Sequence, residues 1–168
     1  IGLKEEFLYL ASKHLGLFPF LGRFYSWHDF PTDDKEISTQ KWHKDGDDEK
    51  FFKIFIYLTD TDKKSGPFSY IKNTHNNGLN RNAGYDKETN THYANFKALN
   101  DNDAFNLFGE DVKECTGDFG TIIFADTSGY HKGKKPEENF RIMLVFEYFS
   151  QSSRYYYDLN LNENIEKR

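Results

Sequence analysis

The chain has 168 residues, a formal net charge of −5 and an aromatic content of 18%. This length suits one domain with a substantial core, and so many aromatic residues exclude an intrinsically disordered chain. The negative charge argues against nucleic acid as a partner, and no apolar run is long enough to span a bilayer. We therefore expect neither nucleic acid nor a membrane as a partner. The single cysteine, Cys115, excludes an internal disulfide and predicts a cytoplasmic location.

The first expected element is a helix at residues 3–15. Apolar side chains recur there at helical spacing, and Gly16 can supply the left-handed residue that commonly ends a helix. His14, near the end of this segment, suits the negative end of the helix dipole and is interpreted as a residue beside the core. The chain begins at Ile1 rather than at a methionine, so a truncated N-terminus is one interpretation of its start.

Short runs of aromatic and β-branched residues predict strands along much of the remaining chain. They lie at residues 18–28, 37–43, 51–59, 67–71, 111–115, 121–126 and 140–149. In the strongest, residues 51–59, Phe52, Ile54 and Ile56 share an apolar face, and Lys53 lies on the opposite face. Many short strands after one helix predict a mainly β fold, a sandwich or jelly roll, whose interior can hold a small ligand.

Two regions lack regular periodicity. Residues 73–102 are rich in Asn, Gly and charge, and an insert this long predicts a lid over a functional site. We expect His75 and His92, which fall in this insert, to be surface or turn residues rather than metal ligands. Residues 150–168 are expected to form a frayed C-terminal tail. No repeat or linker divides the chain, so residues 1–168 are predicted to form a single domain.

The residues that indicate chemistry begin at His43 and Asp45. Side chains two positions apart on a strand share a face, so these two would project together. A His and a carboxylate make two thirds of the set of two His and one carboxylate that holds non-haem Fe(II). His28 and Asp29 are adjacent, would point to opposite faces, and are not expected to be metal ligands.

The order of the motifs resembles the phytanoyl-CoA dioxygenase family of Fe(II)/2-oxoglutarate oxygenases. The likeness is carried by Gln40-x-x-His43-x-Asp45, the strand from Lys53 to Asp60, Gly66-Pro67-Phe68, Gly117-Asp118, His131 and Arg141. This resemblance implies a double-stranded β-helix, a jelly-roll or cupin-like barrel with one N-terminal helix and the lid insert. It implies that His43, Asp45 and His131 are the metal ligands, and that Arg141 pairs with the distal carboxylate of 2-oxoglutarate.

The resemblance also implies the cofactors and the reaction. Fe(II), 2-oxoglutarate as cosubstrate and O2 would hydroxylate an aliphatic C–H of a small-molecule substrate, with release of succinate and CO2. Related halogenases carry a small residue in place of the carboxylate ligand, so Asp45 favours hydroxylation. Arg141 suits a dicarboxylate because its planar fork binds a carboxylate through two hydrogen bonds. Gln40 and Tyr57 are further candidates for cosubstrate contacts.

Other interpretations remain open at this point. A cupin-like metal enzyme without 2-oxoglutarate would share the two His and the Asp but would not need Arg141. A jelly-roll carbohydrate-binding module would use Trp27, Trp42 and tyrosines as stacking platforms and would need no iron. Arg141, in an otherwise apolar strand, would then face solvent or pair with Glu147 or another carboxylate. The sequence leaves the substrate and the oligomeric state open.

Overall fold

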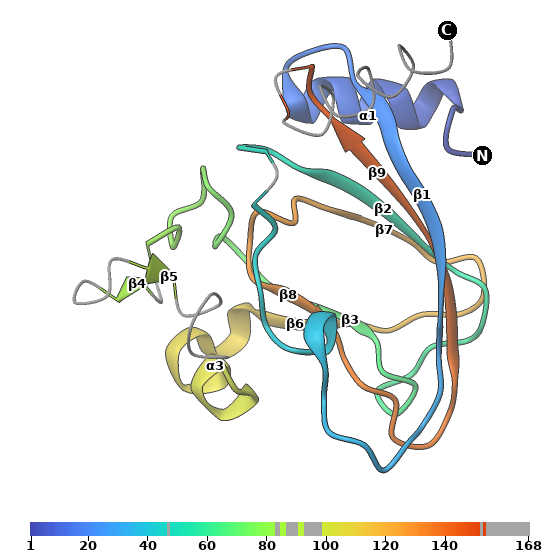
Figure 1. Cartoon of the computed structure of the whole chain (residues 1–168), viewed down its shortest axis with the longest axis vertical. Helices are drawn as coiled ribbons and strands as arrows, with labels where there is room; N and C mark the ends of the chain where they lie inside the picture. The colour runs from blue at the N-terminus through green and yellow to red at the C-terminus, as the bar shows by residue number, and fades with distance from the viewer. Residues whose placement is uncertain (47, 83–84, 87–90, 93–98, 152, 154–168) are drawn as a thin grey trace, which may run out of the picture.

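The computed structural model describes residues 1–46, 48–82, 85–86, 91–92, 99–151 and 153 (Figure 1). Its helices are α1 (Glu5–Leu15) and α3 (Asp101–Phe108), with two short 3₁₀ turns, η1 (Ser38–Gln40) and η2 (Gly109–Asp111). Its strands are β1 (Phe20–Asp29), β2 (Phe52–Tyr57), β3 (Phe68–Ile71), β4 (Tyr85–Asp86), β5 (Thr91–His92), β6 (Val112–Cys115), β7 (Ile122–Ala125), β8 (His131–Gly133) and β9 (Arg141–Phe149). The prediction of a mainly β fold is confirmed.

Two antiparallel sheets form the frame of the molecule. The larger has the order β1-β9-β2-β7 and the smaller the order β6-β3-β8, while β4 and β5 pair with each other. A shared cluster of Phe55, Tyr57, Phe68, Met143 and Val145 fills the space between the sheets. In the described part of the chain the sheets do not close into a barrel, and their arrangement is consistent with a jelly roll.

Strand β2 has the two faces that its alternating sequence predicts. Phe52 and Ile54 pack against α1, whose residues Phe7, Ala11 and Leu15 are buried there. Lys53 and Phe55 point to the other side, into the space between the sheets. Helix α1 ends at Gly16 with φ of 76°, as expected for a left-handed stop. The strand therefore separates a structural face from the face that carries the site.

Two predictions about the elements are wrong. Residues 37–43 do not form a strand, because the Gln40 side chain accepts a hydrogen bond from the Ile37 N–H and tightens this segment into η1. His43 pairs only through an isolated bridge with His131. The second helix, α3, was not expected; Asn100 caps it by accepting a hydrogen bond from the Asp103 N–H, and Phe108 joins a buried cluster with Trp42.

The lid and tail predictions fall largely outside the described residues. Within the predicted insert, only residues 73–82, 85–86, 91–92 and 99–102 are described, and within the tail only 150, 151 and 153. Thr74 in this insert is buried and its hydroxyl binds the Ile71 carbonyl and the Tyr130 N–H, so the start of the insert is anchored to the core. No helix in the described residues has the length and apolar composition needed to cross a membrane.

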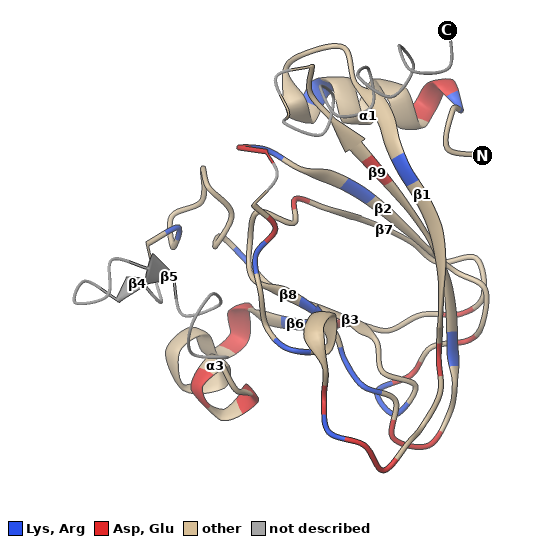
Figure 2. Ribbon diagram, in the orientation of Figure 1, with Lys and Arg blue, Asp and Glu red and all other residues tan. Residues whose placement is uncertain are grey.

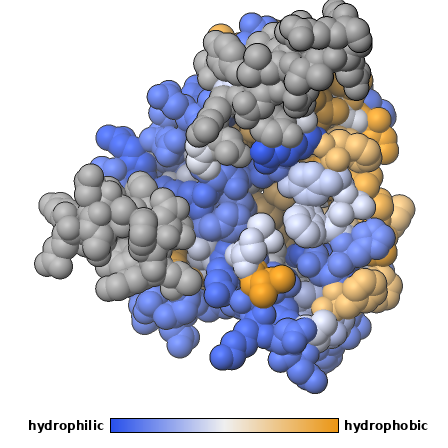
Figure 3. Space-filling view, in the orientation of Figure 1, coloured by the Kyte–Doolittle hydropathy of each residue, from blue (hydrophilic) through white to orange (hydrophobic). Residues whose placement is uncertain are grey.

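The outer surface is unevenly apolar. Figure 3 shows apolar side chains gathered along one edge of the view, beside β1 and the N-terminal segment. Exposed residues here include Leu3 and Phe24, which are 70% and 63% accessible and line a shallow groove with Leu21 and Leu144. The pocket described next lies elsewhere, between the two sheets.

Candidate metal centre and pocket

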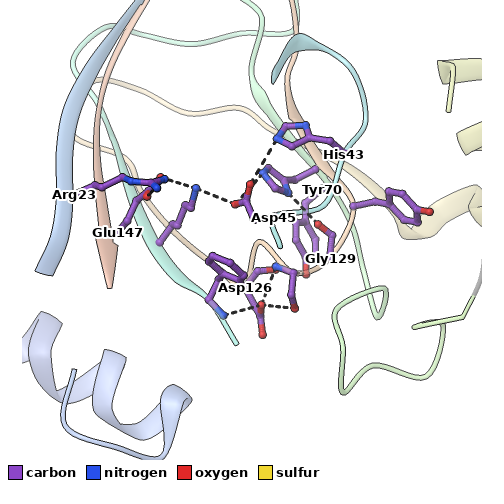
Figure 4. A network of polar contacts seen from close by, with 12 residues as sticks. Arg23, His43, Asp45, Tyr70, Asp126, Gly129 and Glu147 are labelled. Atoms are coloured by element: carbon purple, nitrogen blue, oxygen red, sulfur yellow. Dashed lines mark hydrogen bonds and ion pairs between the residues drawn. The ribbon is translucent and has the colours of Figure 1, made fainter. Parts of the chain in front are cut away.

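His43, Asp45 and His131 converge on one point although they come from two distant segments. The backbones of His43 and His131 exchange two hydrogen bonds of 3.0 and 2.9 Å, and the Asp45 N–H donates to the Thr127 carbonyl at 2.9 Å. One candidate ligand atom from each residue lies within 4.8 Å of the others. Figure 4 shows the His43 imidazole and the Asp45 carboxylate turned toward each other. The bridge to β8, rather than a strand repeat, brings these side chains together.

Backbone carbonyls fix the orientation of both imidazoles. His43 Nδ1 lies 2.8 Å from the Lys41 carbonyl, and His131 Nδ1 lies 2.9 Å from the Gly129 carbonyl. A carbonyl can only accept a hydrogen bond, so each Nδ1 carries a proton, and in the neutral imidazole Nε2 is then the atom that can bind a metal. This arrangement is typical of histidines that bind metals through Nε2.

The distances between these atoms suit a shared cation. His43 Nε2 lies 3.9 Å from Asp45 Oδ1, and His131 Nε2 lies 3.6 Å from Asp45 Oδ2. These separations are too long for hydrogen bonds. Atoms that each lie about 2.1 Å from one divalent ion would be separated by at most about 4 Å. These two separations therefore suit donors around one cation better than a hydrogen-bonded triad.

Burial and neighbouring groups together set the protonation states that metal binding needs. Burial lowers the pKa of His131 to about 3, so its imidazole is neutral near pH 7. Burial raises the pKa of Asp45, but the neighbouring His131 and Lys53 outweigh this and hold it at about 2. A carboxylate with neutral imidazole beside it is the donor set that divalent transition metals bind.

Lys53 is a charged member of the site that the sequence did not indicate. Its Nζ lies 2.8 Å from Asp45 Oδ2 and 2.6 Å from Glu147 Oε1. Glu147 also accepts a hydrogen bond of 2.5 Å from the Tyr25 hydroxyl and lies 3.3 Å from Arg23 Nη1. Figure 2 shows the resulting alternation of positive and negative positions across β1, β9 and β2, and Figure 4 shows the same network reaching Asp45.

This network keeps Lys53 charged. Burial lowers the pKa of Lys53, but the carboxylates of Asp45 and Glu147 outweigh it and raise the pKa above its usual value. Lys53 and Glu147 are direct cross-strand partners on β2 and β9. The alternation of residues 51–59 placed Lys53 on the inner face, but the register with β9 was needed to identify its partner.

Arg141, the first residue of β9, lies at the other end of the pocket. It is 1% exposed, and its Nη2 lies 2.7 Å from Asp29 Oδ2 at the end of β1. Among the described residues, no group accepts a hydrogen bond from its Nε or Nη1. Gly133 makes room for the guanidinium, because a Cβ at this position would come within 3.1 Å of Nη2. The partner of Arg141 is therefore Asp29 and not Glu147.

One pocket joins the two ends. It is lined by the three candidate ligands and Lys53 at one end and by Asp29, Gly133 and Arg141 at the other, with Tyr25, Trp27, Thr39, Gln40, Phe55, Phe68 and Met143 between them. Gln40 thus lies in the pocket, as its predicted role requires. The Tyr57 hydroxyl donates to the Cys115 carbonyl and accepts from the Phe68 N–H, which ties it to β3 and β6. Trp42 is only 3% exposed, so it cannot serve as a stacking platform.

No family model matches the sequence, and no curated protein matches it. Solved structures match the fold: EctD from S. alaskensis with bound Fe has a TM-score of 0.62 at 16% identity, covering 91% of this chain and 52% of that chain. HygX from Streptomyces hygroscopicus with nickel and 2-oxoglutarate bound has a TM-score of 0.57 at 14% identity, covering 90% and 64%.

A third structure, the non-heme monooxygenase ThoJ, has a TM-score of 0.56 at 16% identity, covering 88% of this chain and 53% of that chain. This chain therefore spans between 52% and 64% of the length of these three structures. At sequence identities this low, the structural match shows a shared fold and nothing finer. The chain has the fold found in these metal-binding and non-haem oxygenase structures, and its candidate metal centre lies between the two sheets of that fold.

Proposed function

We propose that this chain forms the iron-binding domain of a 2-oxoglutarate-dependent oxygenase that hydroxylates an aliphatic C–H of a small molecule. One observation carries the proposal: a pocket has two inward-facing imidazole nitrogens and a carboxylate at one end and a buried arginine at the other. The fold shared with structures that hold Fe, or nickel and 2-oxoglutarate, supports it. The sequence motifs favour the phytanoyl-CoA dioxygenase family within this group.

The residues present fit iron. His43, Asp45 and His131 offer one donor atom each, and three protein ligands leave coordination positions open for a cosubstrate and dioxygen. When bound, Fe(II) would supply dioxygen activation coupled to the oxidation of 2-oxoglutarate to succinate and CO2. The carbonyls of Lys41 and Gly129 would hold the two imidazoles in place for the metal.

The other pocket residues would bind and orient the reactants. Arg141 would receive the distal carboxylate of 2-oxoglutarate, since a guanidinium remains charged when buried and matches a carboxylate in shape. Phe55 and Met143 line the pocket between the arginine and the ligand set, and would exclude water from the reacting atoms. Trp27 is 42% exposed and also lines the pocket, so it would contact the substrate at the entrance.

Anaerobic titration tests the proposal. Fe(II) should bind with one equivalent per chain, and 2-oxoglutarate added afterwards should produce a metal-to-ligand charge-transfer absorbance band. A metabolite screen for stimulated succinate release would then identify the substrate class. Iron binding without any response to 2-oxoglutarate would instead favour the cupin-like metal enzyme, for which the pairing of Arg141 with Asp29 is the supporting observation. Failure to bind iron would contradict both enzymes.

A further inference from the structure

The arginine end of the pocket holds a carboxylate of the protein's own. Asp29 and Arg141 are cross-strand partners at the ends of β1 and β9, and both side chains line the pocket. Asp29 Oδ2 lies 2.7 Å from Arg141 Nη2, while Nε and Nη1 of the same buried guanidinium have no hydrogen-bond partner in the described residues. The arginine therefore carries one carboxylate contact and keeps unused donors.

The position of this contact matters because of the shape of a guanidinium. Its donors form two forks, one made by Nε with one terminal nitrogen and the other made by the two terminal nitrogens. Asp29 takes one N–H of Nη2, so it does not fill a fork by two bonds, and a second carboxylate can still approach the free donors. That second carboxylate would approach Asp29 as well, and like charges in a buried site repel each other.

We propose that Asp29 competes with the distal carboxylate of the cosubstrate for Arg141, and so sets the affinity and selectivity of the pocket for dicarboxylates. This inference rests on the proposed function, since it assumes a 2-oxo acid bound at the metal end. In the absence of cosubstrate, Asp29 compensates the buried charge of Arg141. When a dicarboxylate enters, Asp29 yields at least part of its contact, and this displacement weakens binding.

The test compares two 2-oxo acids in the Fe(II)-loaded protein under anaerobic conditions. 2-Oxoglutarate has the distal carboxylate and pyruvate lacks it, while both can chelate iron through the 2-oxo acid group. Asp29→Asn keeps the size of the side chain and removes its charge. We expect this variant to bind 2-oxoglutarate at least tenfold more tightly, with little change for pyruvate, measured from the charge-transfer absorbance. Asp33→Asn, in the exposed loop after β1, controls for the change in net charge and should leave both affinities unchanged.

Asp29→Ser is measured alongside, because it removes the charge with a smaller side chain and should tighten 2-oxoglutarate binding in the same direction. Equal 2-oxoglutarate affinity in wild type and in both folded variants would overturn the competition and leave Asp29 as a structural counter-ion only. Weaker binding in the variants would also overturn it and would make Asp29 a residue that orients Arg141. If wild type and both variants bind iron but none binds 2-oxoglutarate, the proposed function itself fails.

Discussion

The two ends of the pocket each contain a charged residue with a counter-ion from the protein, but the consequences differ. At the metal end, Lys53 lies 2.8 Å from Asp45 Oδ2, the oxygen that is also 3.6 Å from His131 Nε2, while Asp45 Oδ1 faces His43 Nε2 at 3.9 Å. Glu147 contacts the same Lys53 Nζ. At the arginine end, Asp29 lies on a nitrogen that belongs to both forks of the Arg141 guanidinium. The first counter-ion contacts one oxygen of the candidate ligand carboxylate and leaves Oδ1 for a metal, and the second occupies part of the group that would bind the cosubstrate.

The two ends of the pocket therefore have different tasks, metal binding at one and carboxylate binding at the other. The lone pairs at the metal end repel each other unless a cation comes between them, so we expect that end to bind metal with little rearrangement. The arginine end is already neutralised within the protein, so a ligand must displace an existing contact there. We therefore expect metal affinity and cosubstrate affinity to respond to different substitutions.

The largest expected effect is at the metal end. His131→Ala removes a ligand atom from a preorganised set and should abolish stoichiometric Fe(II) binding, since even the partners of metal ligands contribute about 10–100-fold to affinity. Anaerobic equilibrium dialysis measures the amount of Fe(II) bound per chain. His28→Ala is the matched control, because His28 is exposed on β1 and should leave binding intact. One equivalent of iron tightly bound to the His131→Ala protein would rule out this ligand assignment.

The next effect should appear only at the arginine end. Arg141→Met touches no candidate ligand, so iron binding should stay close to that of wild type. Affinity for 2-oxoglutarate should fall by about 30-fold to several thousand-fold, corresponding to about 2–5 kcal/mol for loss of one partner of a buried charged pair. Arg141→Lys should recover only part of the loss, because an ammonium lacks the fork. Unchanged 2-oxoglutarate affinity in Arg141→Met would contradict the assignment of cosubstrate binding to the arginine end.

Lys53→Met should lower the free energy of unfolding of the metal-free protein more than that of the metal-bound protein. It leaves Asp45 and Glu147 buried without their shared cation, and breaking a buried ion pair costs about 3–5 kcal/mol in the free energy of unfolding. Ni(II) should recover part of this loss, since a bound cation would neutralise Asp45 again. Denaturant unfolding with and without Ni(II) measures both. Lys64→Met, which breaks an exposed pair with Glu138, is the control and should leave the free energy of unfolding close to that of wild type. An equal loss in the two variants would argue against a special role for Lys53.

The last expected effect is a dependence of stability on pH. The pKa of His131 is lowered from 6.5 to about 3 in the folded protein, so between these values the unfolded chain binds a proton that the folded chain does not. The free energy of unfolding of the metal-free protein should therefore fall as the pH falls from 6.5 toward 3. Thermal melts at several pH values should show a shallower slope for His131→Asn than for wild type. His28→Asn should keep the wild-type slope, and an equally shallow slope there would contradict the assignment to His131.

Residue patterns within a single segment predicted the helices and strands that depend only on neighbouring residues. The alternation of residues 51–59 predicted β2 and its two faces, the apolar run at residues 140–149 predicted β9, and Gly16 predicted the end of α1. Chain order singled out His43, Asp45 and His131, which the structure places together, although the strand that was expected to align His43 with Asp45 is absent. The assignment of iron to these residues stays a prediction.

The charge partners were decided by tertiary structure alone. Asp29 and Arg141 are 112 residues apart, and they meet because β1 and β9 pair in one particular register. Lys53 and Glu147 meet in the same way on β2 and β9. A shift of one residue in either register would send these side chains to opposite faces. The sequence of one strand taken alone does not identify the residue that it faces on another strand. The sequence could therefore indicate that Arg141 needs a carboxylate partner, but only the packed sheets determined which carboxylates Arg141 and Lys53 have.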